Sequence, residues 1–517
     1  MRSTGFLWPA ASRIGCGIVA LLVAGSVGFA SAKPRYGGVL RVELLAPSVS
    51  LDPRSWKAGS RDLAANERLA ALVFERLIAV DNYGRFVPQL ATEWTHDTNF
   101  RRWQFTIRSG VRFSDGTVLT SVDVARALGA LLPDGWQVSV SGSNVVFQAA
   151  EPRPDVVEVL ASGRFFIYRE SASGVLVGTG PFLLEAATKE SKPALNDAAT
   201  APNTPTQHFR FVANESCWAG RPFLDAVDVT SGVPPLRALF DLQVGKADLV
   251  ELAPDVARRG AQSNTRIWAS SPVTLYALRF ETGSAQSAND GLREALALSL
   301  DRTTMASVLL QKQAQPASAL LPQWLSGYAF LFPADMDVER AKQLRTALPA
   351  NVAGGTSPLR IQPEALGDLP RLLAERVAVN AWQTGLSVQP LSKTPVAHDG
   401  KSTAQEAADI KLFAWRYSSL SPGQELRDLA SAEHAQEAKE GSTADPDRRY
   451  AWERKILEER RVIPLVVLPD FVGLAPAIRD WQPSPWGEWR LADVWLEAAP
   501  AKSSASAPSA NSVGARP

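Results

Sequence analysis

The chain has 517 residues, of which 45% are hydrophobic and 21% charged, and its formal net charge is +1. This length is enough for about three domains with sizeable hydrophobic cores. The near-zero net charge gives no reason to expect a nucleic acid or a strongly acidic partner. After residue 32 no apolar run approaches the roughly 20 residues of a membrane-spanning helix.

The first 32 residues have the features of a secretory signal peptide. Arg2 and Arg13 supply positive charge, Ile14–Phe29 is uncharged and mostly apolar, and Ala30-Ser31-Ala32 is a small-x-small cleavage site before Lys33. The alternative is a retained membrane anchor, but the apolar run has only 16 residues and contains four glycines. We therefore predict cleavage after Ala32 and a periplasmic location.

Alternating strand and helix patterns follow the signal peptide. Residues 39–45 predict a strand, and residues 62–78 have apolar side chains at helical spacing. Trp103, Phe105 and Ile107 alternate with polar residues, and residues 111–113 continue that alternation, which predicts a hairpin. Asp115-Gly116 then predicts a turn.

The pattern continues in the same manner toward the middle of the chain. Thr120, with Asp123 in the first turn, is a favourable N-cap for a helix over 122–132. A second hairpin is predicted at 136–148, and Asp290 opens another helix. Strands interleaved with helices favour a mixed α/β protein.

Two polar stretches predict irregular structure. Residues 188–207 are rich in Ala, Asn, Pro and Thr and predict a surface insertion, and residues 498–517 are of low complexity and predict a solvated tail.

Motifs of common catalytic and metal sites are absent from the sequence. It contains no G-x-S-x-G, H-E-x-x-H or C-x-x-C pattern, and its four histidines are not at ligand spacing. We therefore expect no metal, no cofactor and no enzymatic activity. Once Cys16 leaves with the signal peptide, Cys217 has no disulfide partner, and we interpret it as a small hydrophobic side chain rather than a reactive thiol.

The order of short motifs resembles the family 5 extracellular solute-binding proteins of ABC transporters, which include oligopeptide, dipeptide and nickel binders. The matching pieces, in chain order, are Tyr36-Gly37-Gly38, Leu51-Asp52-Pro53, Phe74-Glu75-Arg76-Leu77, Pro88-Gln89-Leu90-Ala91, Trp103–Gly116, Gly178-Thr179-Gly180-Pro181-Phe182, Trp218-Ala219-Gly220, Gly245-Lys246-Ala247-Asp248, Asp301-Arg302 and Ile463-Pro464-Leu465. Most of these residues are expected to build the scaffold.

This resemblance implies a two-lobed periplasmic-binding-protein fold of type II, in the large peptide-binding class, with a hinge between the lobes. The expected boundaries are 33–272 for lobe I, with an inserted subdomain at about 60–175, then 273–471 for lobe II, and 472–497 for the return to lobe I. Ligands of such proteins are enclosed when the lobes close. The implied function is the periplasmic component of an ABC importer, acting as a monomer with a membrane permease as partner.

By this resemblance, the stretch Ala414–Ser419 corresponds to a segment that binds the ligand in peptide-binding members. In peptide-binding members it has the pattern G-W-x-x-D-Y, and the aspartate holds the ligand's terminal ammonium; aligned on Trp415 and Pro422, Ser418 takes that place. A hydrogen bond to a charged group contributes about 1.5–3 kcal/mol, and serine brings no countercharge. Either another carboxylate, such as Asp409 or Glu425, replaces the aspartate, or the ligand has no free amino terminus there.

Other side chains are expected at the cleft by the same resemblance. The segment after the first strand lines the cleft in relatives, aromatic side chains form a wall, and arginines face a carboxylate. Glu281 is a second departure, because members have asparagine there. The residues expected to contact ligand are Ser48, Val49, Ser50, Arg279, Trp415, Arg416, Tyr417, Ser418 and Trp486.

A small organic solute, peptide or peptide-like, is the ligand that these observations favour. Two alternatives stay open: a secreted hydrolase whose catalytic group carries no motif, and a receptor or chaperone that uses the same fold without a transporter. Nickel alone is disfavoured because the histidines do not cluster.

Overall fold

The computed structural model describes residues 33–132, 135–171, 174–185, 206–282, 286–333, 335–349, 352, 358–364, 367–391, 408–433 and 445–497. The predicted signal peptide, the tail after residue 497 and the insertion up to residue 205 lie outside these ranges. The described residues from Tyr36 onward form one compact unit. No helix in the described ranges combines the length and the apolar character that crossing a bilayer requires.

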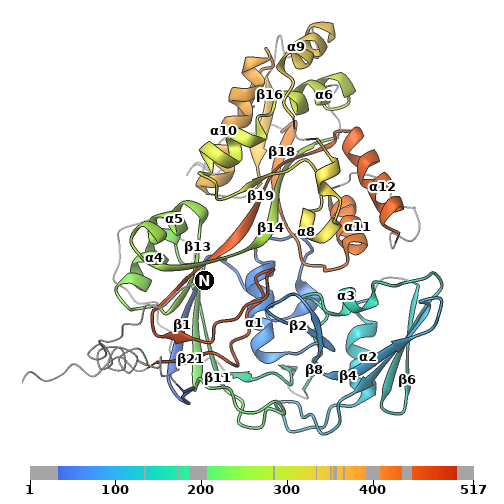
Figure 1. Ribbon diagram of the computed structural model, residues 1–517, viewed down its shortest axis with the longest axis vertical. Coiled ribbons are helices and arrows are strands. Elements are labelled where there is room, and N and C mark those ends of the chain that lie inside the picture. The colour runs from blue at the N-terminus through green and yellow to red at the C-terminus, as the bar shows by residue number, and fades with distance from the viewer. Residues whose placement is uncertain are drawn as a thin grey trace, which may run out of the picture. The chain divides into compact units, whose positions relative to one another are not determined.

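A large mixed sheet runs through this unit (Figure 1). Its strands, in spatial order, are β10 (Phe182–Leu184), β11 (Gln207–Ala213), β12 (Ala226–Ser231), β1 (Val39–Leu44), β13 (Leu249–Leu252), β19 (Val462–Leu474), β14 (Arg266–Phe280), β18 (Ile410–Arg416), β16 (Leu359–Pro363) and β17 (Val388–Pro390), and β15 (Gln315–Pro316) pairs with β19. β1 is parallel to β12 and β13, whereas β19 is antiparallel to β13 and β14. The predicted strand at 39–45 is therefore confirmed.

Two long strands, β14 and β19, join the two halves of the sheet. The first residues of β14, 266–269, pair with the end of β19 next to β13. Residues 274–279 pair with β19, and residues 274–280 pair with β18. Between these parts the register shifts, and Pro272 lies opposite Pro469. Proline has no N–H to donate to a ladder, so the pairing is weakest where the two halves meet.

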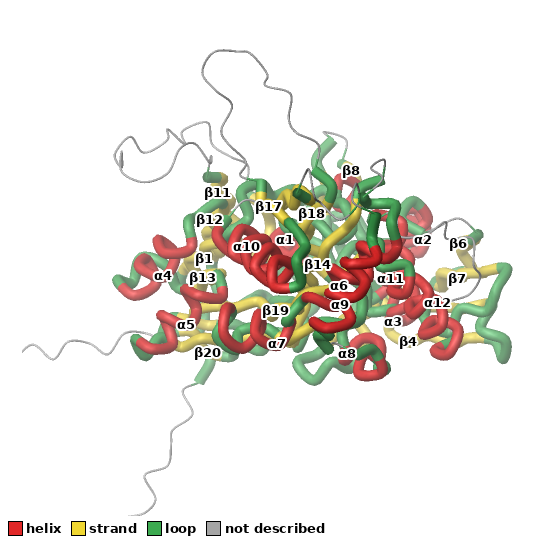
Figure 2. Tube along the Cα trace, turned by 90° about the horizontal axis from the view of Figure 1, so that it is seen from above, coloured by secondary structure: helices red, strands yellow, loops and turns green. Residues whose placement is uncertain are grey.

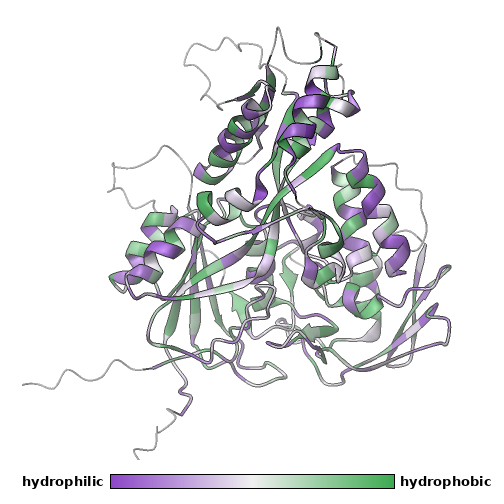
Figure 3. Cartoon of the chain, turned by 45° about the horizontal axis from the view of Figure 1, so that its top comes forward, coloured by the Kyte–Doolittle hydropathy of each residue, from purple (hydrophilic) through white to green (hydrophobic). Residues whose placement is uncertain are grey.

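Helices pack against both halves of this sheet, and they carry both hydrophobic and hydrophilic residues (Figure 3). Figures 1 and 2 both show α4 and α5 near β13, and Figure 1 shows α6, α9 and α10 beside β16. The helices are α1 (Leu63–Val73), α2 (Ser121–Gly129), α3 (Val156–Leu160), α4 (Pro235–Gln243), α5 (Pro254–Gln262), α6 (Asp290–Ser299), α7 (Arg302–Thr304), α8 (Gln323–Ser326), α9 (Val338–Ala347), α10 (Asp368–Gln383), α11 (Pro422–Ala432) and α12 (Pro446–Glu458), with a π-helical turn at Met305–Leu309 and 3-10 turns at Pro53–Ser55 and Ala329–Leu331.

A separate antiparallel sheet carries its own core. Its order is β4 (Ala91–His96), β5 (Arg102–Ile107), β7 (Asn144–Ala149) and β6 (Trp136–Ser141), and α2 and α3 pack with it. The β6–β7 pair confirms the hairpin predicted at 136–148. Small two-stranded sheets complete the strand set: β2 (Ile78–Val80) with β3 (Phe86–Pro88), β8 (Arg169–Glu170) with β9 (Leu176–Val177), and β20 (Ile478–Arg479) with β21 (Trp495–Leu496).

The hairpin predicted from residues 103–113 is wrong. β5 pairs instead with β4 and β7, and residues 111–113 form only the Arg112–Val118 bridge. The alternating apolar pattern correctly predicted which side chains are buried, because Val111 and Phe113 are in the core. It does not predict which strand pairs with β5, because burial alone does not identify the neighbouring strand.

Helix termini follow local chemistry. Thr120 caps α2 as predicted, and the Thr120 and Asp123 side chains satisfy each other's backbone N–H groups in a capping box. The helix predicted over 62–78 ends at Val73, because Phe74 is extended. Asn289, rather than Asp290, caps α6 through Leu292 N.

Several of the sequence motifs converge on one buried carboxylate, Glu75. Its oxygens accept hydrogen bonds from Thr179 Oγ1 (2.7 Å), Trp218 Nε1 (2.8 Å) and Gln89 Nε2 (3.3 Å). These partners lie in three further motifs, so this part of the pattern serves the scaffold.

Candidate ligand-binding site

A cavity of about 50 Å³ lies where distant segments of the chain meet. That volume holds one small polar group or a few water-sized ones, and is far below the roughly 300–1,000 Å³ of pockets that enclose drug-sized ligands. Its walls are Ala64, Glu67, Arg68, Arg76, Ala161, Ser162, Gly163, Phe166, Trp324, Arg416, Tyr417, Ser418, Ser419, Leu420, Ser484, Trp486, Gly487 and Glu488.

Arg416, the last residue of β18, forms one side of the cavity. Its backbone N–H donates to Gly59 O, and its guanidinium donates to Asp470 Oδ1 at 2.7 Å and to Trp486 O at 3.3 Å. These contacts hold the buried Arg416 guanidinium in place at one side of the cavity.

Arg68, on α1, also borders the cavity. It pairs with Glu251 and donates to Asp470 Oδ2 at 2.5 Å, and its guanidinium lies 4.4 Å from the centre of the Trp489 ring. Because Arg416 and Arg68 flank Asp470, they hold the pKa of that carboxyl below its usual range against the opposing effect of burial.

Arg76 forms the opposite side of the cavity. It pairs with Glu488, and its guanidinium lies 5.0 Å from the centre of the Phe166 ring. Burial lowers the pKa of Arg76 to about 10, so the side chain stays charged at neutral pH.

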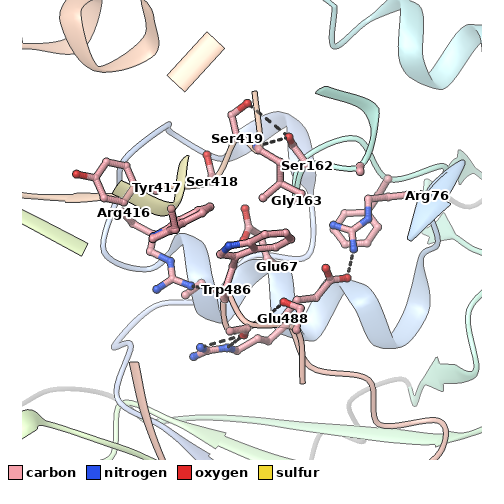
Figure 4. A pocket seen from close by; sticks show the side chains of 18 residues that line it. Glu67, Arg76, Ser162, Gly163, Arg416, Tyr417, Ser418, Ser419, Trp486 and Glu488 are labelled. Carbon is pink, nitrogen blue, oxygen red and sulfur yellow. Dashed lines mark hydrogen bonds and ion pairs between the residues drawn. The ribbon is translucent and has the colours of Figure 1, made fainter. Parts of the chain in front are cut away.

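Glu67 lies between these arginines in the floor of the cavity (Figure 4). Its Oε1 is buried and accepts no hydrogen bond from any described residue. Burial raises the pKa of Glu67 to about 7, although Arg416, Arg76 and Arg68 favour its charged form.

Aromatic side chains close another side. The Trp486 and Trp324 rings stack with centroids 5.4 Å apart, and Trp324 Nε1 donates to Pro272 O at 2.6 Å. Tyr417 borders the cavity, but its hydroxyl donates to Leu320 O at 2.6 Å. Tyr417 therefore borders the cavity with its aromatic ring rather than with its hydroxyl.

The loop after β18 is held by Glu425. This buried carboxylate accepts hydrogen bonds from Trp415 Nε1 (2.6 Å), Ser418 N (3.2 Å) and Ser419 N (2.7 Å). Burial raises the pKa of Glu425 to about 7. The carboxylate is committed to the loop and does not border the cavity.

The structure brings together four of the nine predicted contact residues: Arg416, Tyr417, Ser418 and Trp486 border the cavity. Trp415 is behind the wall, packed on Gly59 and bonded to Glu425. A Cβ added to Gly59 would stand 2.1 Å from the Trp415 ring, so glycine permits this packing.

The remaining predicted contact residues lie elsewhere. Ser48 is exposed, Val49 N donates to Gln207 Oε1, and Ser50 N donates to Asn66 Oδ1. Arg279 pairs with Glu281, Glu364 and Glu433, outside the cavity, and Asp409 accepts from Arg360 N.

Sequence reasoning missed several walls of the cavity. A usable signal was present for the adjacent pair Glu67 and Arg68, which are the only charged residues of α1, a helix otherwise made mainly of Ala and Leu. The rest, such as Ser162, Trp324 and Glu488, come from separate segments and carry no shared local pattern.

Within the described ranges, no group of three or more His, Cys, Asp or Glu side chains is placed to hold a metal ion. His398 and His434 lie outside those ranges. Burial raises the pKa of the Cys217 thiol, which disfavours the reactive thiolate.

Comparison with known proteins places the fold and the site in context. The chain matches the bacterial extracellular solute-binding proteins, family 5 (middle region), over residues 85–434. The chain belongs to this family.

Two relatives of this family 5 protein are periplasmic proteins of Escherichia coli K12. A nickel-binding periplasmic protein is 25% identical over 362 residues, which cover 62% of this chain and 65% of the relative. A periplasmic murein peptide-binding protein, MppA, is 22% identical over 338 residues, which cover 56% and 59%. The matches thus span just under two thirds of these relatives' length.

The fold is that of solved solute-binding proteins. The structure of DppA from Helicobacter pylori, in complex with the peptide STSA, superposes with a TM-score of 0.70 at 17% identity, covering 90% of this chain and 99% of that one. The predicted α/β periplasmic-binding-protein fold is confirmed.

Proposed function

We propose that this family 5 protein is the solute-binding component of an ABC importer, and that it captures a small organic solute, peptide or peptide-like, between two lobes. The observation that carries this proposal is the cavity at the meeting point of α1, the segment after α3, the end of β18 and the segment 484–488. Family membership supports binding without chemistry, and the names of the relatives, which are periplasmic binders of nickel and of murein peptide, support a transport role.

Opening and closing of the cleft follow from the proposed lobes, 33–272 with 472–497, and 273–471. The long strands β14 and β19 cross that boundary, and their register shifts at Pro272 and Pro469 supply a flexible point for a hinge. A solute that contacts both lobes favours the closed state, which a permease then recognises. The small cavity accordingly takes one group of the solute in the closed arrangement.

Export belongs to the same proposal. Cleavage after Ala32 releases a soluble monomer into the periplasm, where the relatives named above are found. Edman sequencing or intact mass of the secreted protein tests this step, and a mass that retains the first 32 residues contradicts it.

The capture role is tested by native mass spectrometry of freshly purified protein, followed by thermal shifts with a panel of amino acids, peptides, amines, sugars and organic acids. We expect a retained compound or a saturable rise in melting temperature with one chemical class. A protein that retains nothing and responds to no member contradicts solute capture, and turnover of a bound peptide or ester favours a hydrolase.

A further inference from the structure

Glu67 differs from Glu488, the other carboxylate that borders the cavity, in forming no ion pair, although three arginines lie close enough to favour its charged form. Arg76 pairs with Glu488, Arg416 pairs with Asp470, and Arg68 pairs with Asp470 and Glu251. Glu67 is in no ion pair of the described residues, and its buried Oε1 accepts no hydrogen bond.

Counting charges around the cavity gives the same result. Three arginines and two carboxylates, Glu67 and Glu488, border the cavity, and Asp470 and Glu251 pair with these arginines from behind its walls. The fully ionised cluster of seven groups therefore has one surplus negative charge, and Glu67 is its carboxylate without an ion pair. An unpaired charge in a desolvated site is costly, and a cationic group of a ligand removes that cost.

Gly163 packs directly against the Glu67 carboxylate at the edge of the cavity. A Cβ added to Gly163 would stand 2.1 Å from Glu67 Oε1, so any larger residue would displace the carboxylate. The cavity volume of about 50 Å³ suits a compact group such as an ammonium.

Two unsatisfied donors accompany this acceptor. The buried Nε–H groups of Arg76 and Arg416, which border the same cavity, have no acceptor among the described residues. A ligand head that has an ammonium next to a carbonyl or carboxylate oxygen, as an amino acid or a peptide amino terminus does, would satisfy both kinds of group.

We propose that Glu67 anchors a primary ammonium of the ligand and so replaces, from α1, the countercharge that Ser418 does not supply. This assignment rests on the proposed solute capture and narrows its ligand to amines, with amino acids and peptides bearing a free amino terminus as the favoured members. Glu67 is then a specificity-determining residue.

The ionisation of Glu67 adds a pH signature. The groups that face it are Arg68 on α1, Arg76 after α1, Arg416 on β18 and Asp470 on β19. Because an ammonium requires the ionised carboxylate, and the pKa of Glu67 is raised to about 7, affinity for an amine should fall as pH drops below 7, by up to about tenfold per unit.

The test uses the mature full chain and a panel of defined probes. Amino acids, di- and tripeptides and simple amines are each paired with their N-acetylated form, and neutral sugars and organic acids are included. We expect at least one amine to bind in calorimetry and its acetylated partner to fail. Glu67→Gln should weaken that amine by about ten- to a hundred-fold, and Glu67→Asp, which keeps the charge, should retain more affinity.

Control measurements distinguish a failure of the role assigned to Glu67 from a failure of the proposed solute capture. Glu93→Gln removes an exposed carboxylate of β4 and should leave amine binding within about twofold of wild type, and urea unfolding should show that Glu67→Gln is folded. Acetylated probes that bind as well as amines, neutral or acidic probes that bind when no amine does, or an unaffected Glu67→Gln overturn the role of Glu67 while solute capture stands. If no probe of any class binds wild type, both proposals fail.

Discussion

Tyr417 and Glu425 lie close to the cavity, but their polar groups form hydrogen bonds within the scaffold and are not available to a ligand. The Tyr417 ring borders the cavity, but its hydroxyl is buried against Leu320 O. Glu425, one of the two carboxylates that the sequence suggested as a replacement for the missing aspartate, instead holds three N–H groups of the β18 loop. A carboxylate whose lone pairs are occupied by the scaffold has little capacity left for a ligand.

Removing the Tyr417 hydroxyl tests its structural role. Tyr417→Phe leaves Leu320 O buried without a donor, and we expect the free energy of unfolding to fall by about 1–2 kcal/mol. Tyr83 is 75% exposed, so Tyr83→Phe should change stability by less than about 0.5 kcal/mol. Urea unfolding monitored by tryptophan fluorescence measures both, and equal effects of the two variants would contradict the assignment.

Some individual residues were within reach of sequence reasoning and others were not. Arg416 and Ser418 were predicted because one continuous stretch resembles a family pattern. Arg279 lies on β14, in the same sheet, but its guanidinium already forms ion pairs with three glutamates. Two of them, Glu364 and Glu433, are far from it in sequence. A candidate arginine can be recognised from sequence, but whether its charge is already neutralised depends on tertiary packing.

At the scale of elements, the junction of α1 with the segment before β10 depends on glycine. Gly180 N donates to Val73 O, where α1 ends, and a Cβ added to Gly178 would stand 2.1 Å from the same carbonyl oxygen. The Gly178-Thr179-Gly180 motif therefore packs backbone against backbone at the end of α1.

This close approach predicts a large effect of one methyl group. Gly178→Ala should destabilise the protein by at least about 2 kcal/mol, because neighbouring backbone rather than a flexible side chain must move. Gly129, the last residue of α2, has no atom within 4 Å of its added Cβ, so Gly129→Ala should be neutral or stabilising by up to about 1 kcal/mol. Denaturation midpoints give the comparison, and a Gly178→Ala protein as stable as wild type would rule out the contact.

Element prediction succeeded where local chemistry decides the outcome. The capping box of Thr120 and Asp123 and the β6–β7 hairpin are set within a few residues of sequence. The pairing of β5 with β4 and β7 requires knowing which distant strand is adjacent, and alternation alone does not contain that information. The cavity was missed in part for the same reason.

For the whole molecule, the decisive contacts are those between segments far apart in the chain. Asp155 Oδ2 accepts from Ser421 Oγ at 2.5 Å, and Ser162 Oγ accepts from Leu420 N at 3.0 Å. Together with the Arg416–Asp470 pair and the Trp324–Trp486 stack they surround the cavity. Any opening of the cleft between the proposed lobes has to break the first two contacts.

The pH dependence of stability is a property of the whole molecule, since it sums over buried carboxyls in different regions. Burial raises the pKa values of Glu43, Glu67, Glu425 and Glu453 to about 7, whereas glutamate in an unfolded chain titrates near about 4.3. Between these values the folded protein binds more protons than the unfolded chain, so the free energy of unfolding should fall as pH rises from about 5 to about 7, by up to about 1.4 kcal/mol per unit for each group.

Carboxyls whose pKa is lowered do not cancel this trend. Asp470, held by Arg68 and Arg416, stabilises the fold as pH rises, but only below the unfolded value near about 4. Urea midpoints at pH 5, 6, 7 and 8 should therefore decrease up to pH 7 and then level off. Glu67→Gln removes one of these four groups without removing an ion pair, so the fall of its urea midpoint with pH should be shallower than that of wild type. A wild-type stability that is flat or rises over this range would show that these carboxyls stay ionised in the folded protein.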